Sequence, residues 1–336
     1  MGIQILLLII GFVLLVKGAD WFVDGAAGVA GKARIPQLII GLTVVAFGTS
    51  APELAVSLSS ALKSSEGVAI GNVIGSNITN ILLILGISAV FKALPVQKNL
   101  RHFDFPVLLG ASALFILFGD TNQKIETWEG IVLAAGLMLY TAFLIVSALR
   151  ERANDGDMSA LNDENQTEEP DNKLAAWYEN MKEKLWFLII ITIVGLALVV
   201  WGADIAVNAA TEIAKYLGVG ENIIGLTVVA IGTSLPELVT SVTAARKGET
   251  DIAVGNIIGS NIFNILMVAG LSAAIMPLTF ESAFIIDAII AFAAAAVLAV
   301  LGYLKGNEIR RTGGIIFLVG FVAYYVYLFI NAGVFA

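Results

Sequence analysis

Cysteine is absent from this chain of 336 residues, and histidine occurs once, at His102. Without cysteine the protein has neither a disulfide scaffold nor thiol chemistry, although this does not identify its compartment. Charged residues are also scarce, at 14%, whereas soluble globular domains have about 25%. The charges that are present give a net charge of −8, which argues against a nucleic-acid partner.

Apolar residues dominate instead. They make up 58% of the sequence, and the mean hydropathy is +0.89, values typical of a membrane protein. The first apolar segment, Gly2–Val23, lacks a basic n-region and a small-residue cleavage site. We therefore expect a retained helix rather than a signal peptide. The only long polar run, Glu151–Asp171, is acidic, and we expect a solvated linker there.

Ten apolar runs are long enough to cross about 30 Å of hydrocarbon, which takes roughly 20 helical residues. They cover about 2–24, 36–62, 67–91, 103–119, 128–149, 185–208, 222–245, 251–275, 282–303 and 312–333. Lysine and arginine predict the orientation, because both are enriched in cytoplasmic loops. If the N-terminus lies outside, the cytoplasmic loops carry fifteen of these residues and the outer loops carry three. We therefore predict a multi-pass cell-membrane protein with both termini outside and the loop 150–184 in the cytoplasm.

The strongest pattern is an internal repeat. GLTVVAFGTSAPEL at 41–54 returns as GLTVVAIGTSLPEL at 225–238, and GNVIGSNITNIL at 71–82 returns as GNIIGSNIFNIL at 255–266. The offset is 184 residues, and 26 of the 42 residues from 41 to 82 are identical in the second copy. Each copy holds five spans, an odd number, so the second copy enters the membrane from the opposite side, as in many secondary transporters.

These observations predict an all-α membrane protein of ten transmembrane helices, arranged as two inverted five-helix repeats with broken helices 2 and 7. The predicted domains are a first repeat at 1–149, an acidic cytoplasmic linker at 150–184 and a second repeat at 185–336. The breaks are expected because Pro52 and Pro236 lie inside spans and remove a backbone donor, while Gly48 and Gly232 loosen the same turns. Carbonyls freed at membrane depth are tolerated only where they are buried in protein or line a polar cavity.

Each broken helix carries a carboxylate beside its proline, Glu53 and Glu237. Helical spacing places Thr49, Ser50 and Ser57 on the face of Glu53, and Thr233, Ser234 and Ser241 on that of Glu237. The next spans carry the stripes Asn72, Ser76, Asn80 and Asn256, Ser260, Asn264. Sites built only from oxygen suit hard cations such as Ca²⁺. A glutamate in hydrocarbon costs roughly 2.5 kcal/mol or more, so two of them require cations. The alternative is that each is protonated, or paired with a neighbouring cation, and only structural.

Other repeated residues have structural interpretations. Four glycines favour close helix packing over ion contact: Gly71, Gly75, Gly255 and Gly259. Asn77 and Asn261 follow the serines by one residue and are expected to hold neighbouring helices, with an ion-ligand role as the alternative. Asp20, with Lys17 nearby, either lines an ion entrance or serves a helix end. His102 is expected to be a solvated side chain in a cytoplasmic loop.

At these motifs the chain resembles the cation/calcium exchanger superfamily. GTSAPEL with GSNITN, and GTSLPEL with GSNIFN, are similar to its two alpha repeats, and the likeness covers nearly the whole chain. The resemblance implies electrogenic exchange of three Na⁺ for one Ca²⁺ by alternating access, with no cofactor and no enzymatic reaction. It also implies the ion ligands: Glu53, Thr49, Ser50, Ser76, Asn80 and the Ala46 carbonyl in the first repeat, and Glu237, Thr233, Ser234, Ser260, Asn264 and the Ala230 carbonyl in the second.

Two departures bear on the branch of the superfamily. Many members, including potassium-dependent ones, have Asp where this chain has Asn264, which weakens the case for K⁺ co-transport. The proton-coupled vacuolar branch typically reads GNxxE where this chain reads GTSAPE and GTSLPE, so Na⁺ is expected in place of protons. Residues 150–184 are too few for the Ca²⁺-sensing domains of eukaryotic exchangers.

Other functions stay open at this point. Exchange of H⁺ for Ca²⁺, or of another divalent cation, would use the same ligand types. A cation channel could use the same oxygens, although an inverted repeat with broken helices favours a carrier. An intramembrane hydrolase would need a base for a serine within the spans, and the only histidine lies in a loop. The expected partners are Na⁺, Ca²⁺ and the lipid bilayer, with no obligate protein partner.

Overall fold

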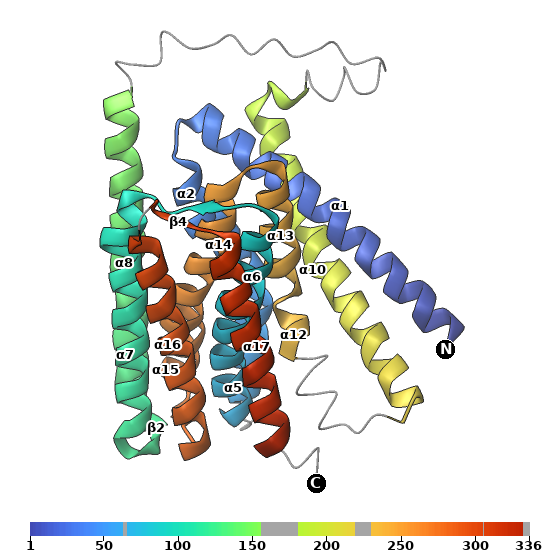
Figure 1. Ribbon diagram of the computed structural model, residues 1–336, viewed down its shortest axis with the longest axis vertical. Coiled ribbons are helices and arrows are strands. Elements are labelled where there is room, and N and C mark those ends of the chain that lie inside the picture. Colours follow the sequence, from blue (N-terminus) through green and yellow to red (C-terminus); the bar gives the residue numbers. More distant parts are fainter. Residues whose placement is uncertain (63–65, 156–180, 219–229, 305, 332–336) are drawn as a thin grey trace.

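The computed structural model describes residues 1–62, 66–155, 181–218, 230–304 and 306–331, which are almost entirely helical (Figure 1). Within this part of the chain, eight helices are long and apolar enough to cross a membrane, and the bent pair Gln37–Thr49 and Ala51–Leu62 is a ninth candidate. The remaining predicted span, 222–245, lies only partly within the described residues. The all-α membrane class is therefore confirmed, and the count of ten spans stays a prediction.

The helices follow the predicted spans closely. The first half comprises α1 (Gly2–Ala33), α2 (Gln37–Ile40), η1 (Gly41–Val45), α3 (Ala46–Thr49), α4 (Ala51–Leu62), α5 (Glu66–Ile78), η2 (Thr79–Leu85), α6 (Gly86–Phe91), η3 (Leu100–Asp104), α7 (Phe105–Asp120), η4 (Thr121–Gln123) and α8 (Thr127–Asp155). The second half comprises α10 (Leu185–Tyr216), α12 (Ala230–Thr233), α13 (Leu235–Lys247), α14 (Thr250–Phe263), η6 (Asn264–Ala269), α15 (Gly270–Ile275), α16 (Ser282–Tyr303) and α17 (Arg311–Asn331). The η segments are π-helical, except η4, which is a 3₁₀ turn.

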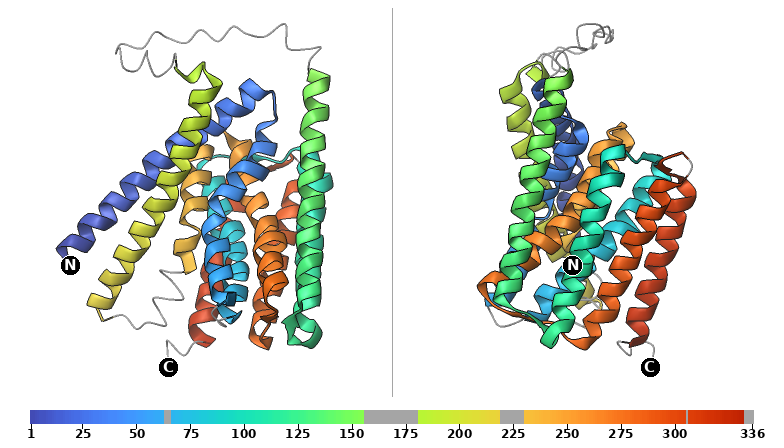
Figure 2. Two further views of the ribbon diagram at one scale, coloured as in Figure 1. Left: turned by 180° about the vertical axis from the view of Figure 1, so that it is seen from behind. Right: turned by 90° about the vertical axis from the view of Figure 1, so that its left-hand side faces the viewer.

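The first and sixth predicted spans, 2–24 and 185–208, are longer than expected. α1 and α10 each run for 32 residues, which is about 48 Å of helix. α1 ends only where Arg34 takes a left-handed conformation, with φ at 53°. Helices of this length exceed the hydrocarbon thickness, so they must tilt or project beyond it. Figures 1 and 2 show them as an inclined pair beside the other helices.

Glycines at every seventh position bring α1 and α10 into close contact. A Cβ atom at Gly18 would lie 2.8 Å from the backbone nitrogen of Val199, and one at Gly202 would lie 2.7 Å from that of Leu15. The same rows contain Gly11, Gly25 and Gly195. Small residues with this spacing let two helix backbones approach, so the pair is held together by close backbone packing.

The centre of the molecule is α14 with η6, which is buried on all sides from Ile252 onwards. A Cβ atom at Gly255 would lie 2.7 Å from the Leu38 carbonyl oxygen, and one at Gly259 would lie 2.8 Å from that of Leu42. The predicted packing role of these two glycines is therefore confirmed. The corresponding role of Gly71 and Gly75 stays a prediction, because the repeat equivalent of Leu38–Leu42, at 222–226, lies outside the described residues.

Both broken segments depart from helical geometry at the expected place. Between α3 and α4, Ser50 has φ −82° and ψ 3°, and the two parts are bent by 44°. Between α12 and α13, Ser234 has φ −86° and ψ 7°. The proline two residues later has no N–H for the carbonyl of Gly48 or Gly232, four residues before it. The Ala46 carbonyl, in contrast, accepts the Ser50 N–H at 3.0 Å, so proline does not free this carbonyl.

Two short antiparallel ribbons join the halves of the chain. β1 (Leu94–Pro95) pairs with β4 (Glu308–Ile309), and β2 (Lys124–Ile125) pairs with β3 (Leu278–Thr279). A shift of 184 residues converts one ribbon into the other, since Leu94 opposite Ile309 corresponds to Leu278 opposite Ile125. The ribbons lie at opposite ends of the helices, with β4 near the upper end and β2 near the lower end of Figure 1.

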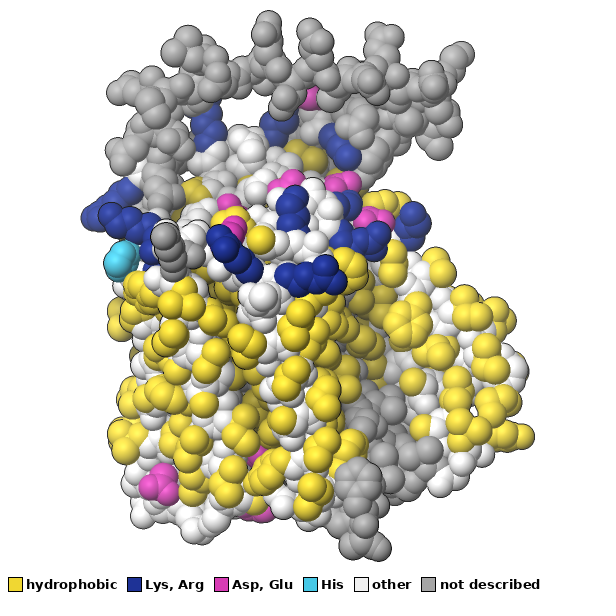
Figure 3. Space-filling model, viewed as in Figure 1, with side chains coloured by type: hydrophobic (Ala, Val, Ile, Leu, Met, Phe, Trp, Pro, Cys, Tyr) yellow, Lys and Arg dark blue, Asp and Glu magenta, His cyan; other side chains and the backbone are white. Residues whose placement is uncertain are grey.

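Basic side chains gather at one end of the molecule, above a broad apolar surface (Figure 3). Lys247 lies there with its Nζ 2.7 Å from an Asp24 carboxylate oxygen and 3.4 Å from one of Asp20. The cation beside Asp20 is therefore Lys247 rather than Lys17, and the pair connects α1 to α13. His102 is exposed at this end, as expected, but it lies in the π-helical segment η3 rather than in a loop. The start of α1 and the end of α17 both lie toward the opposite end (Figure 1).

Candidate ion-binding site

Glu53 and Glu237 open the second halves of the two broken helices. α4 begins at Ala51 and α13 at Leu235, so each glutamate lies in a first helical turn, where unpaired N–H groups and the helix dipole favour negative charge. Both side chains are buried, with exposures of 1% and 0%. Within the described residues neither glutamate has a lysine or arginine ion-pair partner. The described residues therefore contain no cation that could form a structural ion pair with either glutamate.

Serines from both halves of the chain surround each carboxylate. The Ser50 hydroxyl donates to Oε1 of Glu237 at 3.0 Å, and the Ser260 hydroxyl lies 3.5 Å from the same oxygen. Glu53 has the equivalent neighbours, Ser234 and Ser76, but among the described residues no contact to either of its oxygens has the geometry of the Ser50–Glu237 bond. Each glutamate is thus approached by the serine at the other half's helix break and by a serine of the following helix in its own half.

An outer ring of hydrogen bonds holds the broken helices against α5 and α14. The Thr49 hydroxyl lies 3.0 Å from Oδ1 of Asn256, whose Nδ2 donates to the Ser241 hydroxyl at 2.8 Å. The equivalent bonds in the other half join Thr233 to Asn72 at 3.5 Å and Asn72 to Ser57 at 2.9 Å. Ser57 and Ser241 share the glutamate face, as predicted, but their hydrogen bonds go to these asparagines. Their part is to position the helices.

Eight buried side-chain atoms of the predicted ligands have no hydrogen-bond partner within the part of the chain that the structure describes. They are both oxygens of Glu53, Oε2 of Glu237, the hydroxyls of Ser76 and Ser234, Oδ1 and Nδ2 of Asn80, and Oδ1 of Asn264. Buried polar atoms are nearly always paired, so each exception needs an explanation. Seven of these eight are oxygens, and they come from both halves of the chain around two carboxylates. A bound hard cation would satisfy them.

Asn77, the asparagine of the first GSN motif, contacts the other half of the chain, as the sequence predicts for a residue that holds neighbouring helices. Oδ1 of Asn77 accepts from Nδ2 of Asn264 at 3.1 Å, and its Nδ2 lies 3.4 Å from the Asn261 carbonyl oxygen. The bond fixes the Asn264 amide so that its nitrogen is occupied and its oxygen is left free. Asn261 donates instead to the carbonyl of Ile257 in its own helix, at 2.6 Å.

The structure brings the predicted residues together from α3, α4, α5, η2, α12, α13, α14 and η6. Of Ala230, the structure describes only the backbone. Sequence reasoning missed Thr240, whose buried hydroxyl has no partner, because its repeat equivalent is Val56 and no motif marks it. Among the described residues no three His, Cys, Asp or Glu side chains form a metal cluster, because this site has only two carboxylates and otherwise hydroxyls and amides.

Comparison with known proteins gives the family. The family model described as sodium/calcium exchanger protein matches residues 3–146 and again residues 187–330, an offset of 184. The chain belongs to the sodium/calcium exchanger family. It is 33% identical to the sodium/calcium exchanger MaX1 of Methanosarcina acetivorans, over 97% of this chain and 99% of that one. It is 36% identical to the putative antiporter CaxA of Alkalimonas amylolytica, over 98% and 99%.

A solved structure of the sodium-calcium exchanger NCX_Mj matches with a TM-score of 0.80 and 30% identity, covering 96% of this chain and 98% of that one. As a member of the exchanger family, the chain is a multi-pass membrane protein and a cation/Ca²⁺ antiporter. It is not an enzyme, and its ions are transported substrates rather than cofactors. Membership of an antiporter family sets the hydrolase and channel alternatives aside.

Proposed function

We propose that the protein exchanges three Na⁺ for one Ca²⁺ by alternating access at the site between its broken helices. The proposed ligands are Glu53, Thr49, Ser50, Ser76, Asn80 and the Ala46 carbonyl, with Glu237, Thr233, Ser234, Ser260, Asn264 and the Ala230 carbonyl. The observation that carries the proposal is the group of unpartnered buried oxygens around two carboxylates with no cation partner in the described residues. Thr49 and Ala46 already use their side chain or carbonyl in hydrogen bonds, so their part in ion binding is through remaining lone pairs.

Charge supports the stoichiometry. Two ionised glutamates give the site a charge of −2, which one Ca²⁺ neutralises and three Na⁺ convert to +1. A 3:1 cycle therefore moves one net positive charge with the sodium ions. Moving one charge through the membrane potential corresponds to about 2.3 kcal/mol per 100 mV, or roughly fifty-fold in the Ca²⁺ gradient that the cycle can hold.

The architecture we propose is ten spans in two inverted repeats, 1–149 and 185–336, joined by a cytoplasmic linker at 150–184. Three observations support it: the ribbons related by the 184-residue offset at opposite ends of the molecule, the breaks at Ser50 and Ser234, and the hydrogen bonds that cross between halves. The basic end in Figure 3 is the proposed cytoplasmic end, because positive residues are retained inside. This orientation leaves both termini outside. We also propose that the protein needs no obligate protein partner.

The first test is ⁴⁵Ca²⁺ uptake into proteoliposomes. Vesicles loaded with Na⁺ and diluted into choline should accumulate Ca²⁺, and vesicles with only a pH gradient should not. Uptake driven by the pH gradient without Na⁺ would replace the proposal with H⁺/Ca²⁺ exchange. Uptake of Sr²⁺ or Mn²⁺ in preference to Ca²⁺ would identify another divalent substrate.

The second test is voltage. With the potential clamped by an ionophore, the Na⁺/Ca²⁺ equilibrium should shift in the direction of Ca²⁺ export from the negative side, by roughly fifty-fold per 100 mV. An equilibrium that does not respond to voltage would mean 2:1 exchange, with two sodium ions matching the two glutamates.

A further inference from the structure

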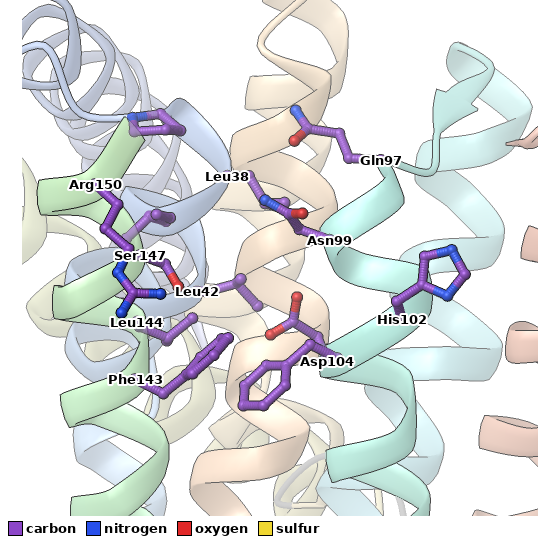
Figure 4. A pocket seen from close by; sticks show the side chains of 13 residues that line it. Leu38, Leu42, Gln97, Asn99, His102, Asp104, Phe143, Leu144, Ser147 and Arg150 are labelled. Carbon is purple, nitrogen blue, oxygen red and sulfur yellow. The ribbon is translucent and has the colours of Figure 1, made fainter. Parts of the chain in front are cut away.

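A second polar site lies away from the ion site, at the basic end of the molecule. It is a cavity of about 250 Å³ between the start of the second span (α2 and η1), η3 and the last turns of α8 (Figure 4). Leu38, Leu42 and Leu144 form part of its walls, and all three side chains are buried. Phe143 and Arg150 lie at its exposed rim.

Asp104 provides the cavity with a buried carboxyl group. Its side chain is 2% exposed, and its Oδ1 accepts the Tyr140 hydroxyl at 3.0 Å. Among the described residues no lysine or arginine forms an ion pair with it. A carboxylate can accept about four hydrogen bonds, so one phenol leaves most of its capacity open. In Figure 4 the carboxylate faces the cavity, and the His102 ring is turned away from it.

The repeat shows that Asp104 is not required by the fold. Its equivalent in the second half, 184 residues later, is Ala288. Tyr140 does have an equivalent, Tyr324, which lies beside Asp287. Asp287 is only half-buried and lines none of four well-formed cavities of the described residues, whereas Asp104 lines one of them. The two acid–phenol pairs therefore share their chemistry but differ in their surroundings.

The charges around the cavity match a zwitterion. Asp104 lies in the interior, and Arg150 and Ser147 face it from α8 at the opening (Figure 4). A cavity of about 250 Å³ has room for far more than one ion and its water, since one water occupies about 30 Å³. Apolar walls are a poor environment for such water. A ligand with an ammonium group, a phosphate and apolar chains matches the carboxyl group of Asp104, the guanidinium group of Arg150 and the apolar walls.

We infer that this cavity binds the headgroup of phosphatidylethanolamine from the leaflet at the basic end, with its ammonium on Asp104 and its phosphate on Arg150. A primary ammonium has three N–H donors for the open carboxylate positions, whereas a choline headgroup has none. The aromatic rings nearby do not form an open box for choline either: Phe103 stacks on Phe143 at 3.5 Å and on Tyr140 at 6.1 Å between centroids, so the rings pack against one another.

The experiment is lipid retention by the full chain. The purified protein is placed in nanodiscs containing phosphatidylethanolamine and phosphatidylcholine in equal amounts, and the lipids retained after detergent extraction are identified by native mass spectrometry. The wild type should retain phosphatidylethanolamine over phosphatidylcholine by about tenfold, the effect of a hydrogen bond to a charged group. Asp104→Asn should remove this preference. Asp287→Asn, the matched acid beside a tyrosine but outside this cavity, should keep it. Equal retention of the two lipids by the wild type, or an unchanged preference in Asp104→Asn, would overturn the inference.

A second measurement uses only the wild-type protein, so it does not depend on how a variant folds. Successive N-methylation of the lipid amine removes one donor at a time, and retention should fall with each methyl group. Competition with octylamine distinguishes the source of the ammonium group. If octylamine protects the cavity and phosphatidylethanolamine does not, the site takes soluble amines and the lipid assignment is wrong. None of these outcomes depends on which ions the protein exchanges.

Discussion

The two halves of the site have the same residue types but different hydrogen bonds. Glu237 accepts from Ser50 at 3.0 Å, whereas among the described residues Glu53 has only the weaker contacts of Ser234 and Ser76. Asn264 donates to Asn77 at 3.1 Å, whereas its repeat equivalent Asn80 has no hydrogen-bond partner in the part of the chain that the structure describes. Two near-identical sequences therefore do not produce two identical half-sites.

The residues around the repeated ones explain how this difference can arise. Thr79 precedes Asn80, and Phe263 precedes Asn264. Phe263 packs edge-on against Phe47, with ring centroids 6.0 Å apart, and this contact has no counterpart because Phe47 corresponds to Ile231. The two asparagines therefore differ in their immediate neighbours, at positions where the repeat has diverged.

The largest effect is expected from removing either carboxylate. Glu53→Gln and Glu237→Gln should each lower Na⁺-driven Ca²⁺ exchange at least a hundredfold, because losing one partner of a buried charge interaction costs about 3–5 kcal/mol. The measurement is ⁴⁵Ca²⁺ flux per folded protein, with folding checked by gel filtration and thermal melting. Near-normal flux in either variant would show that this glutamate is not an ion ligand. Only the other half of the site would then contribute an essential carboxylate.

The glycines of α14 and α5 test whether the packing is symmetric. Gly259→Ala should lower stability by about 1–3 kcal/mol, because overpacking a tight contact has this cost, and its Cβ would lie 2.8 Å from the Leu42 carbonyl. Gly75→Ala should cost a similar amount if the two repeats pack alike. Among the described residues a Cβ at either Gly75 or Gly110 has no atom within 4 Å; Gly110→Ala is the control because Gly110 is exposed on α7, whereas Gly75 is the repeat equivalent of Gly259. A Gly75→Ala protein as stable as the control would show that the packing symmetry fails in that half.

The serines at the helix breaks give the sharpest comparison of the halves. Ser50→Ala removes a hydrogen bond of 3.0 Å to Glu237, whereas Ser234→Ala removes a hydroxyl that lies near Glu53 in weaker geometry. In Na⁺-free buffer the first variant should lose thermal stability by about 1 kcal/mol more than the second, the net value of a typical hydrogen bond. Ca²⁺ binding, measured by isothermal titration, should weaken in both, because both hydroxyls face a carboxylate. Equal stability losses would mean that the different hydrogen bonding of Glu53 and Glu237 does not affect the free energy of unfolding.

Much of the fold and of the site could be predicted from the sequence, because each motif occurs twice. Pro52 and Pro236 predicted the breaks, and the glutamates, serines and asparagines of the motifs come together as expected. What the sequence could not give was the pairing between halves. Helical spacing places Ser50 on the face of Glu53, but the bond goes to Glu237 of the other half, and such contacts depend on how two helices meet. The extra length of α1 and α10 was missed because span prediction follows the apolar run, whereas a helix continues until its backbone is interrupted.

The smallest effect, no change at all, is expected for potassium. Asn264 and Asn80 are repeat equivalents and both are amides, so on this point the two halves agree and neither adds a charge to the two glutamates. A K⁺ bound together with Ca²⁺ would need a ligand set of its own, and the amides at these two positions bring no carboxylate for it. Na⁺-driven Ca²⁺ uptake should therefore keep its rate when choline replaces K⁺ on both sides of the vesicle. Replacing Na⁺ by choline in the same vesicles should abolish uptake, which establishes that the assay responds to a missing ion. A strict K⁺ requirement would mean that a third acidic ligand, brought from elsewhere in the chain, acts at the site.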